Sequence, residues 1–139
     1  MDAFTLTTAF ISLLGWGVGS FIAKLATNRI GEKAMFWDML GYAPVVFIYC
    51  LLAFRVKDVI SVDRQGMILG LLAGFIGSFG VIFFYLLLTR KDASSAVPIT
   101  ALYPALTAIL AIIFLKEPLT WIKAVGIGLS AVALILLSL

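Results

Sequence analysis

Polar and aromatic side chains recur at every fourth position along the first apolar segment of the chain: Ser12, Trp16, Ser20 and Lys24. A step of four residues drifts by about 40° around an α-helix, so the four side chains share one broad face. Tryptophan normally prefers a membrane interface, so Trp16 at the middle of an apolar segment needs a reason. It either packs between helices beside its flanking glycines or lines the path of a solute. The accompanying serines favour the path.

A second polar face lies in the segment 93–115, where Thr100, Tyr103, Pro104 and Thr107 follow at helical spacing. Pro98 and Pro104 each lack a backbone donor and free the carbonyl four residues earlier, so we expect both to bend this helix. A bent polar face predicts the wall of a cavity. The alternative is that the prolines are tolerated because nearby hydroxyl groups complete the local hydrogen bonding.

Lys24 is the one charge on the first of these faces, about 14 Å from the middle of its segment at 1.5 Å per residue. Its ammonium group either extends to the lipid headgroups or pairs with Asp38, which lies just inside the next apolar segment. No aspartate or glutamate lies deep inside any segment. A proton relay built on carboxylates is therefore not evident.

The usual catalytic and metal-binding residues are missing. The sequence has no histidine, and its only cysteine is Cys50, which excludes a disulfide framework and a His/Cys metal site. Without paired carboxylates or a nucleophile beside a base, acid–base catalysis has no candidates. We therefore expect no enzyme activity, no cofactor and no metal.

Composition identifies the class of protein to which these faces belong. Of the 139 residues, 63% are hydrophobic and 12% are charged, against about half and a quarter in soluble domains. The mean hydropathy is +1.18. The net charge of +3 is small and its basic residues are scattered. These values exclude a soluble enzyme, a nucleic-acid-binding protein and a disordered chain, and they indicate a polytopic membrane protein.

The apolar runs are long enough for helices that cross a bilayer, which needs about 20 residues. They lack the alternation of a β-barrel strand, and the acidic start at Asp2 is unlike a signal peptide. We therefore predict an all-α polytopic membrane protein with one domain, 1–139, and short loops. Its five transmembrane helices are predicted at approximately 3–26, 35–54, 66–89, 93–115 and 120–139.

The third predicted helix carries a row of glycines: Gly66, Gly70, Gly74 and Gly77. Helices in lipid associate by close packing, which small residues permit. This row predicts a helix-packing face, and it is also compatible with a surface that slides during conformational exchange.

Several short motifs carry a resemblance to a known family, at residues 15–17, 92–98, 101–104, 116–120 and 126–128. Through them the chain resembles the EamA domain of the drug/metabolite transporter superfamily over essentially its full length. The family usually has Gly-Glu-Arg at the turn after the fourth helix. This chain has Lys116, Glu117 and Pro118 there, so the glutamate matches and the arginine is lost.

The resemblance implies a fold made from two copies. Most relatives fuse two five-helix units in inverted orientation, so this chain would be half of a ten-helix inverted-repeat transporter. In those relatives helices 1, 3 and 4 line the cavity. That implies substrate-binding roles for Trp16, Ser20, Lys24, Tyr85, Thr100, Tyr103 and Thr107. The related small multidrug exporters need a glutamate in helix 1, and its absence here argues against proton-coupled export of cationic drugs.

The sequence thus predicts a secondary transporter of a small organic solute or metabolite, acting by alternating access in a homodimer. The alternative is a non-transporting subunit that heterodimerises with or stabilises another membrane protein. The expected partners are a second copy, the lipid bilayer and a small-molecule substrate, with no nucleic acid. The expected location is a bacterial or archaeal plasma membrane.

Charge counting adds a prediction about orientation. With five spans, the N-terminal face carries Arg55, Lys57, Arg64, Lys116 and Lys123, and the opposite face carries Lys24, Arg29, Lys33, Arg90 and Lys91. Orientation follows an excess of Lys and Arg in cytoplasmic loops, and here neither face has one. We therefore predict insertion in both orientations and an antiparallel homodimer. The alternative is that helix 1 or Asp2 fixes one orientation, which leaves a parallel dimer or a monomer.

Overall fold

The computed structural model describes residues 2–138, apart from the side chains of residues 134, 137 and 138. Its regular elements are all helices, and no strand occurs within that range. The predicted all-α class is confirmed. The chain divides into two compact units, Met1–Arg90 and Lys91–Leu139.

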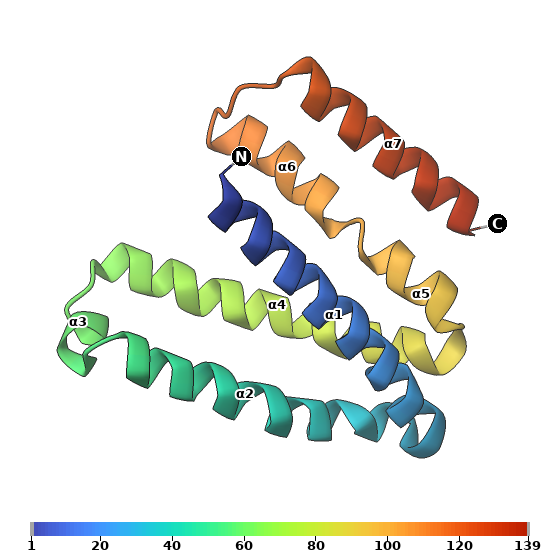
Figure 1. Cartoon of the computed structure of the whole chain (residues 1–139), viewed down its shortest axis with the longest axis horizontal. Helices are drawn as coiled ribbons and strands as arrows, with labels where there is room; N and C mark the ends of the chain where they lie inside the picture. Colours follow the sequence, from blue (N-terminus) through green and yellow to red (C-terminus); the bar gives the residue numbers. More distant parts are fainter. Residues whose placement is uncertain (1, 139) are drawn as a thin grey trace. The chain divides into compact units, whose positions relative to one another are not determined.

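The first unit contains α1 (Ala3–Ile30), α2 (Ala34–Ala53), the short α3 (Val56–Ile60) and α4 (Arg64–Arg90). Helix α1 begins where the sequence predicts, because Asp2 caps it: its carboxylate accepts a hydrogen bond from the Thr5 N–H at 3.1 Å. This bond holds the pKa of the Asp2 carboxyl below its usual value. In Figure 1, α2 and α4 run in opposite directions and are joined through α3.

The chain reverses between α1 and α2 in a single 3₁₀ turn, η1 (Gly31–Lys33). Gly31 adopts a φ of 64°, which a side chain would oppose, and its N–H donates to the Thr27 carbonyl. Helix α1 therefore ends at Ile30, four residues beyond the predicted end at 26. The sequence between Thr27 and Gly31 has no feature that would stop a helix earlier.

The core of this unit is small and lies at one end of its helices. Its buried residues come from the last turns of α1, the start of α2 and the last turns of α4: Ala23, Thr27, Ala34, Tyr85 and Leu88. Most other large apolar side chains are exposed. Apolar surface on this scale is not stable in water, so these faces must be covered by lipid or by other protein surface.

The second unit contains α5 (Ala93–Thr100), α6 (Tyr103–Phe114) and α7 (Trp121–Ser138). Helix α7 packs against both α5 and α6 and runs in the opposite direction (Figure 1). The segment predicted over 93–115, with bends at its prolines, forms one apolar stretch, Ala93–Phe114, whose helix is interrupted at residues 101–102. Pro104 at the start of α6 cannot donate to the Thr100 carbonyl, and its ring would clash there. Pro98 lies inside α5 without interrupting it.

Three described stretches are long and apolar enough to cross a membrane: Ala3–Ala53, Arg64–Arg90 and Ala93–Phe114. The first includes both α1 and α2 with the turn between them. Trp121–Ala133 is a shorter apolar stretch within α7. The remaining helix limits agree with the predicted ones to within two residues, and α3 occupies part of the predicted loop after α2.

Candidate functional site

Lys24 reaches from α1 to the end of α4. Its Nζ donates a hydrogen bond to the Leu88 carbonyl oxygen at 2.8 Å, and the Leu88 side chain is fully buried. The last four carbonyls of an α-helix have no partner within the helix. The C-terminal end of the helix dipole also favours a cation. Lys24 therefore satisfies an orphan carbonyl of α4 and complements the charge of that helix end.

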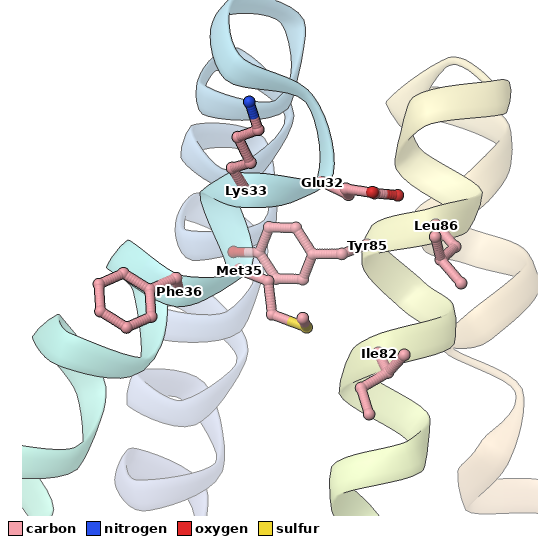
Figure 2. Close-up of a pocket in the computed structure, with 7 residues that line it drawn as sticks. All are labelled: Glu32, Lys33, Met35, Phe36, Ile82, Tyr85 and Leu86. Carbon is pink, nitrogen blue, oxygen red and sulfur yellow. The ribbon is translucent and has the colours of Figure 1, made fainter.

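Tyr85 lies one turn before Leu88 on α4 and is 2% exposed. Its ring extends from α4 toward α2 (Figure 2), and its hydroxyl group interacts with the carboxylate of Asp38. The sequence offered Asp38 as a partner for Lys24. In the structure Asp38 interacts with Tyr85, and Lys24 bonds to the backbone of α4. Of the predicted site residues, Lys24 and Tyr85 are brought together at this end of the unit.

The other predicted site residues of α1 lie further along the same helix face. Ser20 is half-buried one turn from Lys24, and Trp16 is 66% exposed one turn beyond. Nothing lies within 4 Å of a Cβ built at Gly15 or Gly17. The indole is thus open to its surroundings, and the glycines beside it have no neighbour among the described residues.

In the second unit, two predicted site residues lie on either side of the interruption, Thr100 at the end of α5 and Tyr103 at the start of α6. The Thr100 hydroxyl donates to the carbonyls of Ala96 and Val97, both at 3.0 Å. The Thr107 hydroxyl donates to the Tyr103 carbonyl at 3.1 Å. With its proton bonded to the backbone, each threonine hydroxyl remains an acceptor for a donor on a solute.

A pocket of about 380 Å³ lies between α6 and α7. At one end Glu117 and Lys123 form an ion pair, with 3.4 Å between the Lys123 Nζ and the Glu117 Oε2. Both side chains are nearly half exposed, so the pair adds at most about 1 kcal/mol to stability. The remaining wall is mainly apolar or small: Pro104, Ala108, Ile112, Gly126, Ile127 and Ser130.

The turn after α6 contains the position where this chain departs from the family pattern. Lys116 has a φ of 55°, a left-handed conformation that glycine adopts without strain, and the family usually has glycine there. The Glu117 N–H then returns to the Ala111 carbonyl at 3.4 Å. Sequence reasoning missed Lys123, whose ammonium supplies a cation beside Glu117 where the family arginine is lost. Its position in the first turn of the next helix was the available signal.

Replacing Lys116 with glycine is expected to stabilise the protein by about 1 kcal/mol, because glycine removes the side-chain strain of the left-handed conformation. The measurement is thermal unfolding of the purified protein in detergent micelles. Lys57→Gly is the control, because Lys57 lies inside α3 and glycine should destabilise that helix. An unchanged or lower midpoint for Lys116→Gly would show that Lys116 is not strained.

The predicted packing glycines of α4 have no neighbour within this unit. Nothing lies within 4 Å of a Cβ built at Gly70, Gly74 or Gly77, and the one atom near Gly66 is an Asp63 oxygen at 3.8 Å. Their role in helix packing stays a prediction. The described residues of the first unit leave this face of α4 open.

The seven predicted substrate-binding residues fall in both units. Trp16, Ser20, Lys24 and Tyr85 belong to the first, and the remaining three belong to the second. Thr100 ends α5, whereas Tyr103 and Thr107 lie on α6, so the predicted face is divided by the interruption. The substrate-binding roles of all seven residues stay a prediction. Among the described residues no group of three or more His, Cys, Asp or Glu side chains could hold a metal ion.

Comparison with known proteins identifies a relative and a family. The chain is 32% identical over 125 residues to the uncharacterized protein MJ1333.1 of Methanocaldococcus jannaschii, covering 89% of this chain and 88% of that protein. No solved structure matches the chain. The EamA-like transporter family matches it over residues 3–139, which takes in both units. This membrane protein therefore belongs to the EamA-like transporter family.

Proposed function

We propose that the protein is a secondary transporter of a small organic solute or metabolite, which works by alternating access as a homodimer. The observation that carries the proposal is the match to a transporter family over residues 3–139. The interrupted helix α5–α6 supports it, because transporters commonly build their solute sites where a membrane helix is broken.

The proposal counts five membrane crossings: α1, α2, α4, α5 with α6, and α7. The 51-residue stretch Ala3–Ala53 supplies two of them, because η1 reverses the chain. Helix α7 has 18 residues, or about 27 Å at 1.5 Å per residue, close to the thickness of the hydrocarbon core. A second copy in the opposite orientation would complete an inverted repeat of ten helices.

The open glycine face of α4 supports the dimer. Gly70, Gly74 and Gly77 would admit a helix of a second copy at close range, and no described residue of the first unit occupies that space. The exposed apolar faces of the first unit would then be covered partly by the second copy and partly by lipid.

Each unit offers its own groups to a solute in this proposal. In the first unit Trp16 stacks against the solute and Ser20 forms a hydrogen bond with it. In the second unit Tyr103 offers a ring, and Thr100 and Thr107 offer hydroxyl groups. Tyr85 positions the end of α4, and Lys24 attracts a carboxylate or phosphate group. At the interruption, the Thr100 carbonyl, to which Pro104 cannot donate, offers a further polar contact.

Reconstitution tests the function directly. Purified protein in liposomes is loaded with mixed metabolites, and the exchange of each metabolite is followed by mass spectrometry, with empty liposomes as the reference. Saturable movement of at least one organic solute is expected. A folded dimer that moves none of them in either direction would contradict the proposal.

The role of Lys24 gives a specific prediction. Lys24→Gln should weaken the binding of an anionic solute by about tenfold and leave neutral solutes unaffected, because a single attractive charge is lost. Binding is measured by the change in tryptophan fluorescence on titration. The control is Lys57→Gln, which removes an exposed charge from α3. Equal losses for anionic and neutral solutes would assign Lys24 a structural role only.

A further inference from the structure

A second pocket, of about 330 Å³, lies in the first unit beside the turn between α1 and α2. Its apolar lining comes from Met35 and Phe36 at the start of α2 and from Ile82 and Leu86 on α4, and Glu32 and Lys33 of η1 line its other end (Figure 2). The site proposed for transport uses one residue of this pocket, Tyr85, whose ring lies between the two helices.

The pocket runs from charged groups to apolar ones, as the edge of a bilayer does. Glu32, Lys33 and nearby Arg29 mark the turn as the polar end. Phe36 packs edge-to-face on Trp37 with 5.7 Å between the ring centroids, and aromatic rings of this kind gather at the membrane interface. Leu86 and then Ile82, one turn further from the end of α4, extend the wall toward the hydrocarbon core.

The two charges at the polar end are available to a ligand. Among the described residues neither Glu32 nor Lys33 forms an ion pair or a side-chain hydrogen bond. In Figure 2 the carboxylate of Glu32 points toward α4, and the Lys33 ammonium group points away from the Tyr85 ring. A ligand that matches this end carries one positive and one negative group.

We propose that this pocket binds a zwitterionic phospholipid with a primary ammonium group, of the phosphatidylethanolamine type. Its ammonium group donates hydrogen bonds to Glu32, its phosphate meets Lys33, and one acyl chain lies along Phe36, Ile82 and Leu86. These three side chains are exposed, at 62%, 39% and 38%, so the groove is open to lipid along its length. The inference does not depend on which solute the protein transports.

The headgroup chemistry makes the proposal selective. A carboxylate accepts hydrogen bonds from the three N–H donors of a primary ammonium group, whereas the quaternary ammonium of phosphatidylcholine has no N–H to donate. Phosphatidylglycerol has no cation and would place its negative charge beside Glu32. One charge-assisted hydrogen bond corresponds to a preference of about tenfold.

Native mass spectrometry of the full-length protein in detergent measures this preference. The probes are phosphatidylethanolamine, phosphatidylcholine and phosphatidylglycerol with identical acyl chains, each added at the same concentration. We expect phosphatidylethanolamine to bind about tenfold better than the other two. Free phosphoethanolamine should not displace it, because the apolar wall contributes to binding.

Variants connect the preference to the pocket. Glu32→Gln should reduce the preference for phosphatidylethanolamine to less than about twofold, and Ile82→Trp should fill the groove and weaken all three lipids. Asp58→Asn is the matched control, an exposed carboxylate on α3 away from the pocket. Thermal unfolding of each variant verifies that it is folded.

Three outcomes would overturn the proposal. Equal binding of the three lipids would show that the headgroup is not recognised, and an undiminished preference in folded Glu32→Gln would place the site elsewhere. Displacement by free phosphoethanolamine would identify the ligand as a water-soluble zwitterion. None of these outcomes bears on the transport assay.

Discussion

Replacing Pro104 with alanine is expected to join α5 and α6 into one helix and to lower transport by at least about tenfold. Alanine restores an N–H that can donate to the Thr100 carbonyl, and it removes the ring that occupies that space. An interior proline costs a helix about 3 kcal/mol, so its removal strongly favours the continuous form. The protein should fold and express normally, because joining α5 and α6 into one straight helix does not lower its stability.

The structural part of this expectation needs no known substrate. The Cα chemical shifts of Ala101 and Leu102, measured by NMR, should move to helical values in the variant. Pro44→Ala is the matched control: Pro44 lies inside α2, which is continuous through it, so its replacement should leave transport unchanged. A joined helix with full transport would show that the interruption has no part in the mechanism.

The fold was largely predictable because the main signals are local. A run of some 20 residues without a charge favours a helix in lipid, and most predicted helix limits agree with the structure. Pro98 and Pro104 predicted a bend or break in the segment 93–115, but not which of the two prolines would interrupt the helix, since a proline in a membrane helix can either bend the helix or end it. Whether the helix bends or ends depends on where α6 begins, at Tyr103. The helical spacing of the side chains does not show that position.

The candidate site was predictable only as faces of single helices. Spacing correctly placed Lys24 one turn from Ser20, but it could not identify the Leu88 carbonyl as the acceptor for Lys24. Every residue has a carbonyl, so an unpaired one at a helix end has no sequence signature. Opposite charges in matching positions suggested Asp38 instead, whereas Asp38 interacts with the hydroxyl of Tyr85.

Glu117 also shows that the sequence does not identify the partner of a side chain on another element. The family pattern drew attention to a missing arginine next to Glu117, but a cation can come from any element that the fold brings close. Lys123 comes from the following helix, six residues along the chain. Spacing along one helix therefore predicts which side chains share a face, while their partners on other elements come from the packing of the fold.

The equal number of basic residues on the two predicted faces leads to the other large expected effect, which concerns the orientation of the chain in the membrane. Two C-terminal reporters, one active only in the cytoplasm and one active only outside it, should both give strong signals when fused separately to this chain. The five basic residues on each predicted face leave no excess to decide which face stays in the cytoplasm. Molecules in both orientations are what an antiparallel homodimer requires.

One added lysine should then shift the distribution to about 3:1, because the balance is close to even. Ser61→Lys, in the loop before α4, should retain the N-terminal face in the cytoplasm. Asn28→Lys, near the end of α1, should have the opposite effect. Ser61→Gln and Asn28→Gln are the controls for side-chain size. If the unchanged chain reports from one side only, and neither lysine alters this, then helix 1 or Asp2 fixes the orientation, and a dimer formed by the chain alone must be parallel.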